Sequence, residues 1–277
     1  MISLLKTEWL KLRKYPAFWL LTGLCLLSYP GINYIFLNTY DSLSKKEDAT
    51  GKIVTMFLGN PFSFPEVWRS SAYLTSLFVF IPAVLVIMLI TNEYTYKTSR
   101  QNIIDGWSRQ DFMLAKLIDV LLVVLMVTAL YAIVAYIIGY TNTEADVTDR
   151  WSLAYYIPLF ALQTFAQLSI AFLVGLLVRK SFIALAIFLF YSMIAEPIAV
   201  NLLKYKFLKN DLGRFLPLEL SDRMIPPPAF MGRFDEKAYQ ASLDAVQPHI
   251  IYTIILVLLT WGINYLIYKD GIFECLQ

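Results

Sequence analysis

NEYTYKTSRQNIIDGWSRQDFMLAK, residues 92–116, is a polar stretch between two long apolar runs of the chain. The run before it covers about 72–91, and the run after it covers about 117–140. A helix crosses the hydrocarbon of a bilayer with roughly 20 apolar residues, and each run meets that length. The stretch is therefore predicted to be a loop outside the bilayer that joins two membrane-spanning helices.

Capping residues divide this loop. Thr98 and Gln101 have the spacing of a capping box, which predicts a helix that begins at Ser99. Gly106 is suited to end that helix, because glycine readily adopts the left-handed conformation that follows a helix C-terminus. We therefore expect a helix over Ser99–Asp105, which would be about 10 Å long at a rise of about 1.5 Å per residue.

A second capping box, formed by Ser108 and Asp111, predicts the start of the helix that enters the next span. The short helix before it has an apolar face with polar side chains around it: Ile103, Ile104 and Trp107, surrounded by Arg100, Asp105 and Arg109. Such an amphipathic helix, fixed between two spans, is suited to docking onto another protein. The alternative is a solvated connector.

The composition excludes an ordinary soluble domain. Of the 277 residues, 58% are hydrophobic and 16% are charged, and the mean hydropathy is +0.59. Soluble domains contain about 25% charged residues, so the bilayer must be the solvent for much of this chain. The two cysteines, Cys25 and Cys275, indicate no disulfide or metal site. The single histidine, His249, argues against histidine-based catalysis.

The apolar segments predict an all-α polytopic membrane protein with six transmembrane helices in a single domain, 1–277. Pro82 is expected to be tolerated near the middle of the second span. The predicted spans cover about 17–36, 72–91, 117–140, 153–178, 182–200 and 249–268.

Residues 1–14 are predicted to form an N-terminal helix in the membrane interface, since their apolar side chains share one helical face. A signal peptide is the alternative, but no small-residue cleavage site follows the apolar run. Basic residues gather in 1–14, in 93–116 and in the tight turn 179–181. These segments fall on one side of the membrane, which the positive-inside rule assigns to the cytoplasm. Both termini are therefore expected in the cytoplasm.

The loop resembles the loop after the second span in six-span (type-2) ABC-type export permeases. In that family a glutamate ends the span, a Gly-Thr pair follows, and a Ser-Arg pair precedes the next span. RQNIIDGWSR is similar to a Bacteroidetes-like branch. Lys97 stands where the family has glycine, and the matching positions are Glu93, Thr98, Ser108, Arg109 and Lys116.

The resemblance implies that Ser99–Asp105 is a coupling helix, which sits in a cleft of a separate ABC ATPase subunit. It also implies a second permease subunit, identical or homologous, and a location in the bacterial cytoplasmic (inner) membrane. The extracytoplasmic region 201–247 is expected to form short re-entrant helices before the last span, with an ordinary outer loop as the alternative. The residues assigned to ATPase coupling are Glu93, Thr98, Ser99, Arg100, Gln101, Asn102, Ile103, Ile104, Asp105, Gly106, Trp107, Ser108 and Arg109.

A phosphate-binding loop of the form G-x-x-x-x-G-K-[ST] does not occur in the sequence. We therefore expect no cofactor in this chain, and we expect ATP and Mg²⁺ to bind the partner ATPase. No catalytic set or metal-ligand cluster stands out. The basic residues serve topology, so nucleic acid is not an expected partner, whereas the lipid bilayer is.

Three polar residues inside the predicted spans are candidates for a substrate path. Gln163 and Gln167 share one face of the fourth span, where they either line a path or hold helices together. Glu196 precedes Pro197 in the fifth span, and an intramembrane carboxylate indicates either a functional group or the end of the helix at the interface.

The sequence thus predicts the membrane-spanning permease subunit of an ATP-driven ABC exporter, which acts as a dimer. An integral membrane enzyme acting on lipids remains open, but it needs a cluster of catalytic polar residues that the sequence does not show. An ion-coupled carrier also remains open, but it needs more buried ionisable residues and usually inverted repeats.

Overall fold

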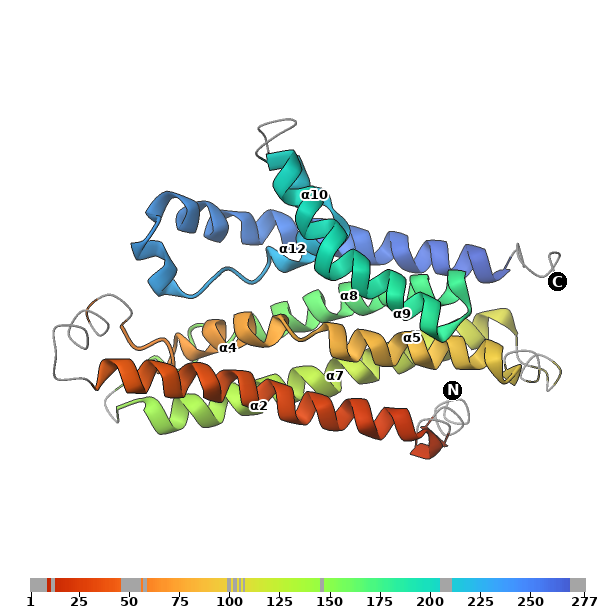
Figure 1. Ribbon diagram of the computed structural model, residues 1–277, viewed down its shortest axis with the longest axis horizontal. Helices are drawn as coiled ribbons and strands as arrows, with labels where there is room; N and C mark the ends of the chain where they lie inside the picture. Colours follow the sequence, from red (N-terminus) through yellow and green to blue (C-terminus); the bar gives the residue numbers. More distant parts are fainter. Residues whose placement is uncertain are drawn as a thin grey trace.

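The computed structural model describes residues 9–10, 13–45, 56, 59–98, 101, 104, 106, 108–144, 147–204 and 211–269. These residues form an elongated bundle whose long helices run side by side along its length (Figure 1). No strand occurs among them. Of the predicted interfacial helix 1–14, residues 1–8 and 11–12 lie outside the described residues, and residues 9–10 and 13–14 are helical.

Five helical segments in the described part of the chain are long and apolar enough to cross a membrane, and a bent helix pair gives a sixth. The predicted all-α, polytopic membrane fold is therefore confirmed. The single segments are α2 (Pro16–Ser44), α7 (Arg109–Asn142), α8 (Tyr156–Val178), Ser181–Leu202 and α12 (Glu236–Lys269), and the bent pair is α4 (Val67–Ser76) with α5 (Phe80–Thr95).

The second predicted span is not one continuous helix, because α4 and α5 meet at an angle of 49°. Pro82 explains the break. Proline has no N–H to donate to the carbonyl of Phe78, and its ring clashes with that carbonyl. The Phe78 carbonyl instead accepts a bond of 3.0 Å from the N–H of Ile81, so the chain passes through a tight turn before α5 begins.

Several helices are longer than the spans predicted from apolar runs. α2 continues through Pro30 to Ser44, and α12 begins at Glu236, well before His249. An apolar run reports only the length inside hydrocarbon, whereas a helix can continue where water solvates its polar side chains. The fifth predicted span is also interrupted.

That span consists of α9 (Ser181–Phe190), a π-helical turn (Tyr191–Ala195) and α10 (Glu196–Leu202). The N–H of Glu196 donates to the carbonyl of Tyr191, five residues back, as in a π-helix. The wider turn rotates α10 relative to α9, and Glu196 is buried although the residues of the π turn are not.

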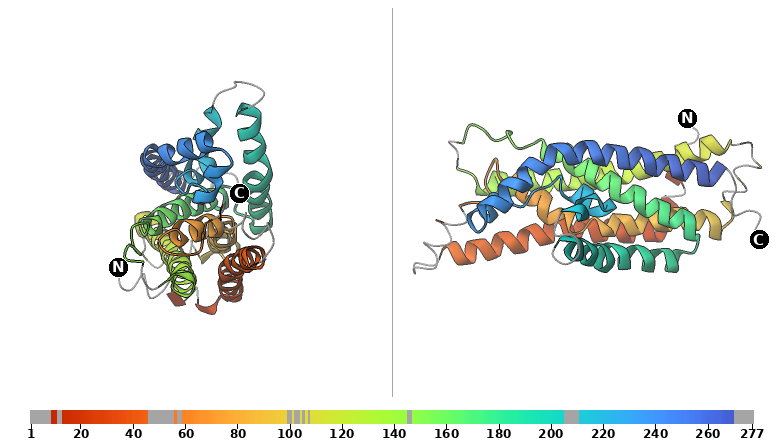
Figure 2. Two further views of the ribbon diagram at one scale, coloured as in Figure 1. Left: turned by 90° about the vertical axis from the view of Figure 1, so that its left-hand side faces the viewer. Right: turned by 90° about the horizontal axis from the view of Figure 1, so that it is seen from above.

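α8 lies at the centre of the bundle and packs against α5, α7, α9 and α12. In the most apolar window of α8, 56% of the residues are buried, against 17% for Ser181–Leu202. The latter segment lies at the edge of the bundle (Figure 2). Gly175 permits the close approach of α8 to α5, because a Cβ there would lie 2.4 Å from Cγ2 of Ile90.

Short helices are present in the described part of 201–247, as predicted: η3 (Leu212–Phe215), α11 (Pro217–Asp222) and η4 (Ala229–Arg233). α11 packs against α8 and α12, so this region is folded onto the bundle. At the opposite end of the bundle lie the start of α2, the end of α5, the start of α7 and the end of α12 (Figure 1).

Candidate functional site

A buried group of charges joins the two helices that flank the polar loop at residues 92–116. Glu93 lies near the end of α5, and Lys116 and Asp119 lie in the first turns of α7. The Lys116 Nζ is 2.7 Å from Oε1 of Glu93 and 3.2 Å from Oδ2 of Asp119. The hydroxyl of Thr98 donates to the other carboxylate oxygen of Glu93. All three charged side chains are at most 5% exposed.

Such a group fixes the relative position of α5 and α7. Moving charges out of water costs several kcal/mol per ion, and only close, well-aligned partners offset that cost. Lys116 therefore holds Glu93 and Asp119 together. A displacement that separates α5 from α7 would break the contact between Lys116 and Glu93 or expose it to solvent. The two points where the loop leaves and re-enters the bundle are thus linked by the same ion pairs.

The backbone at the start of the loop adopts the conformation that suits the glycine of the resembling family. Lys97 has a φ of 55°, in the left-handed region. A residue with a Cβ is strained there by roughly 1–2 kcal/mol, and glycine is not. Lys97 thus adopts a backbone conformation that glycine could adopt without strain. Gly106 also has a positive φ, of 93°.

Most of the predicted coupling helix lies outside the described residues: Ser99, Arg100, Asn102, Ile103, Asp105 and Trp107. Gln101 and Ile104 are helical and exposed. The predicted capping interaction of Thr98 is replaced, since its hydroxyl donates to Glu93 and the N–H of Gln101 donates to the carbonyl of Lys97. The assignment of Ser99–Asp105 as a coupling helix stays a prediction.

The second capping box is present. The Ser108 side chain accepts from the N–H of Asp111, and the Asp111 carboxylate accepts from the N–H of Ser108, at 3.1 Å each. Arg109 then donates to the carbonyl of Lys269 at the end of α12, where a cation is favoured by the helix dipole. The end of the loop is thus tied to the last span as well as to α5.

At the other end of the bundle, Gln163 and Gln167 converge on one acceptor. Both side-chain amides donate to Oδ1 of Asp222, at 2.6 Å each. They do share one helical face, as predicted, and they hold α11 against α8. The structure favours the interpretation that these glutamines hold helices together. Their shared partner, Asp222, was not predicted from the sequence.

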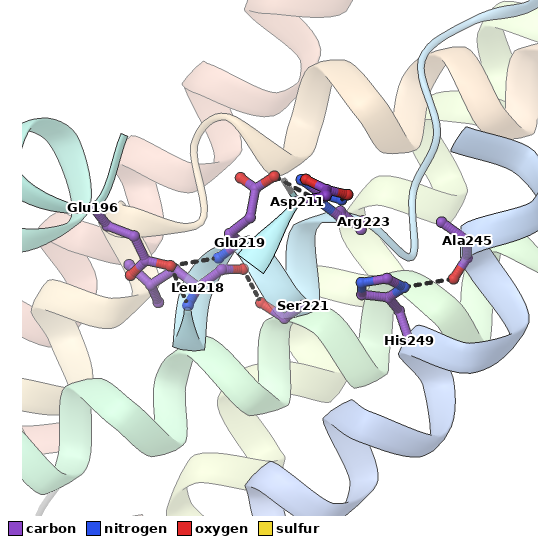
Figure 3. Close-up of polar contacts among 8 residues, drawn as sticks. All are labelled: Glu196, Asp211, Leu218, Glu219, Ser221, Arg223, Ala245 and His249. Atoms are coloured by element: carbon purple, nitrogen blue, oxygen red, sulfur yellow. Dashed lines mark hydrogen bonds and ion pairs between the residues drawn. The ribbon is translucent and has the colours of Figure 1, made fainter. Parts of the chain in front are cut away.

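Glu196 has a defined partner. Its Oε1 accepts from the N–H groups of Leu218 and Glu219, at 2.8 and 2.6 Å (Figure 3). These N–H groups belong to the first turn of α11 and have no partner within that helix. Glu196 therefore caps α11 from a neighbouring helix, a contact that the sequence did not predict, and its assignment to a substrate path stays a prediction.

Replacement of Glu196 by alanine is expected to destabilise the docking of α11 by about 1–3 kcal/mol, because two buried donors lose their acceptor. Glu196→Gln keeps an acceptor oxygen and should lose less. Hydrogen exchange of the 217–222 backbone, measured by mass spectrometry, checks this. Asn201→Ala, an exposed change on α10, is the control, and equal exchange in Glu196→Ala and the control would contradict the prediction.

A cavity of about 910 Å³ lies beside α11, between it and the N-terminal part of α12. One wall carries a charged network, in which Arg223 bonds to Glu219 at 2.8 Å and to Asp211 at 2.8 Å (Figure 3). Among the residues that line it are Tyr73, Asp222, His249 and Tyr252. The cavity lies next to the Gln163–Gln167–Asp222 link.

Sequence reasoning missed the residues around α11 for a physical reason. Asp222 is 59 residues from Gln163 in the chain, and no local spacing predicts their contact. Lys116 and Asp119 had a detectable signal, since opposite charges three residues apart occur at the start of an otherwise apolar run. Among the residues that the structure describes, no group of His, Cys, Asp and Glu could hold a metal ion.

The fold defines a multi-pass, all-α membrane protein. The family model of the ABC-2 family transporter proteins matches residues 4–195, which is more than half of the chain. The chain therefore belongs to the ABC-2 transporter family and is a permease subunit of an ABC transporter. No curated protein and no solved structure gives a significant match.

Proposed function

We propose that this chain forms the translocation path of an ATP-driven exporter, as a dimer with an identical or homologous permease. Two separate ATPase subunits would bind ATP and Mg²⁺ and dock onto the cytoplasmic loop at Ser99–Asp105. The protein would lie in the bacterial cytoplasmic membrane with both termini inside, as its basic residues favour. Membership of the ABC-2 family supports the general scheme.

The observation that carries the coupling proposal is the buried Glu93–Lys116–Asp119 group at the base of the loop. A force on the loop would reach α5 and α7 together, since their ends are joined by the same lysine. Arg109 would pass it to α12 through the carbonyl of Lys269. α5 in turn packs along α8, so the central helix would follow. This is a hinge-like change driven by closure of the ATPase subunits.

The dimer proposal is supported by the weak burial of three spans. Only 17–22% of the residues in the apolar windows of α2, Ser181–Leu202 and α12 are buried inside one chain. Their remaining apolar surface is available for lipid and for a second permease. α8, by contrast, is enclosed by its own chain.

Charge reversal in the loop tests the coupling. Arg100→Glu with Asp105→Lys, or Trp107→Ala, is expected to leave the permease folded but to lower transport-coupled ATPase activity by about ten-fold, a loss of about 1.4 kcal/mol of coupling. The assay uses the permease co-purified with its ATPase and reconstituted in liposomes. Lys237→Glu, an exposed change at the outer end of α12, is the control.

Two results would refute the proposal. One is the absence of any ATPase with a phosphate-binding loop from the complex purified out of its native membrane. The other is normal ATPase coupling in the loop variants.

A further inference from the structure

The cavity beside α11 contains an acid, Asp222, that accepts hydrogen bonds from two uncharged side chains. Oδ1 of Asp222 accepts from Gln163 and Gln167, at 2.6 Å each. The residues that the structure describes provide no ion pair to this carboxylate, although its side chain is exposed to the cavity. Desolvation by the surrounding protein raises the pKa of Asp222 to about 7; the nearby carboxylates of Glu219 and Glu196 act in the same direction, and the hydrogen bonds from Gln163 and Gln167 oppose it.

His249 offers a second acceptor in the same cavity. Its side chain is 2% exposed, and its Nδ1 lies 2.6 Å from the carbonyl oxygen of Ala245 (Figure 3). A carbonyl can only accept, so Nδ1 carries the proton, and in the neutral ring Nε2 carries a lone pair. Within the described part of the chain, that Nε2 has no hydrogen-bond partner. A buried acceptor without a donor is costly, so a ligand with a donor would stabilise it.

Arg223, one of the basic residues that line the cavity, is directed to other acids. Arg223 bonds to both Asp211 and Glu219. The hydrogen bonds from Arg223 lower the pKa of Asp211, and the charges of Lys204 and Arg214 lower it further. Arg223 therefore pairs with both Asp211 and Glu219, whereas the described residues provide no such cation to Asp222.

The rest of the lining suits an amphiphile. Ile225, Pro226 and Pro227 provide an apolar wall, and Tyr73 and Tyr252 provide aromatic rings, which attract ammonium groups when their faces are accessible. The volume of about 910 Å³ lies in the range of small-molecule sites.

We propose that this cavity binds a protonated amine of an amphiphilic organic cation, whose N–H groups donate to Asp222 and His249. The apolar part of the ligand would lie against the proline wall. The inference deepens the proposed export function, since it names the chemical class that the outer cavity accepts. It rests on that function only for the direction of movement, because binding can be measured without ATP or the ATPase.

The test uses the purified full chain in phosphatidylcholine nanodiscs, with binding measured by saturation-transfer NMR against empty nanodiscs. n-Hexylamine, which is charged and has N–H donors at neutral pH, is expected to bind saturably. Three control ligands share the six-carbon tail of n-hexylamine. Hexanol has no charge, hexanoate has the opposite charge, and hexyltrimethylammonium has the positive charge but no N–H donor. Each should bind about ten-fold more weakly or worse, as a charge-assisted hydrogen bond predicts.

Asp222→Asn is expected to weaken hexylamine binding about ten-fold or more. It keeps an oxygen that accepts from both glutamines, so α11 should stay docked. Asp149→Asn, an exposed acid on another loop, should bind hexylamine like the unchanged protein. His249→Phe gives an independent readout, since it removes the second acceptor and leaves Asp222 in place, and it should also weaken binding.

Adding phosphatidylethanolamine to the nanodiscs separates two sources of the amine. Competition with hexylamine would identify a lipid headgroup as the occupant, and the absence of competition would identify a free amine, and both support the proposal. Hexanoate binding as tightly as hexylamine, or equal hexylamine binding by Asp222→Asn and the unchanged protein, would overturn it. Either result would leave the ATPase-coupling proposal standing.

Discussion

Replacing Lys116 by methionine is expected to destabilise the protein by about 3–5 kcal/mol. The substitution keeps most of the side-chain volume but leaves Glu93 and Asp119 without the ammonium group that lies 2.7 and 3.2 Å from them. Two buried carboxylates would then lose the counter-charge that Lys116 provides, and with it the contact that joins Glu93 of α5 to α7. Equilibrium unfolding in mixed micelles measures the loss.

The chain offers a matched control for this prediction. Lys45 and Asp41 form an ion pair of the same length, 2.7 Å, but the lysine side chain is 75% exposed. Lys45→Met should cost less than about 1 kcal/mol, because water already screens an exposed pair. If Lys116→Met and Lys45→Met have the same effect, the buried group does not hold the loop.

A triple variant distinguishes the loss of the ion-pair attraction from the cost of leaving buried carboxylates without Lys116. Glu93→Gln and Asp119→Asn, added to Lys116→Met, remove every charge of the group. Most of the stability should return, since an uncompensated buried charge costs more than the pair contributes. Transport-coupled ATPase activity should stay low in the triple variant if the charges themselves transmit the movement of the loop.

Gly175→Leu is expected to separate α8 from α5 and to destabilise the protein by about 1–3 kcal/mol or more. A Cβ at this position would lie 2.4 Å from Cγ2 of Ile90 and 3.5 Å from the backbone of Ile87. The Ile90 methyl group cannot move aside easily, because a β-branched side chain has one strongly preferred rotamer in a helix. The same unfolding measurement applies, together with gel filtration.

Gly262 in α12 is the control, since a Cβ there would have no atom within 4 Å. Gly262→Leu should be neutral or slightly stabilising, because leucine has the higher helix propensity. Adding Ile90→Ala to Gly175→Leu should restore part of the stability by making room for the new side chain. Equal stability of the two leucine variants would show that α5 and α8 do not pack closely at this point.

Much of the fold could be predicted because hydrophobicity is a local property. Each apolar run reports that its own residues need a non-aqueous solvent, and the two capping residues Ser108 and Asp111 are neighbours in sequence. The interruptions were harder to predict. Pro82 breaks the second span and the π turn Tyr191–Ala195 interrupts the fifth, and whether a proline kinks or ends a helix depends on the packing around it.

The candidate sites also differ in how far the sequence alone could reveal them. The loop at residues 92–116 stood out because polar residues are rare in this chain and lie there together. The partners of Gln163, Gln167 and Glu196 could not be predicted, since Asp222, Leu218 and Glu219 reach them only when α11 folds back onto the bundle. A single polar residue in a span indicates that it needs a partner but not which one.

The sequence by itself determined that this chain crosses a membrane several times, because its apolar runs are too long and too many for a water-soluble core. It also determined where the loop leaves the bilayer, since capping and charge are read from neighbouring residues. Only the tertiary structure decided that Lys116 joins two helix ends and that α11 closes over α8 beside a charged cavity. Those contacts unite residues that are distant in the chain, and only the packing of the helices brings them within bonding distance.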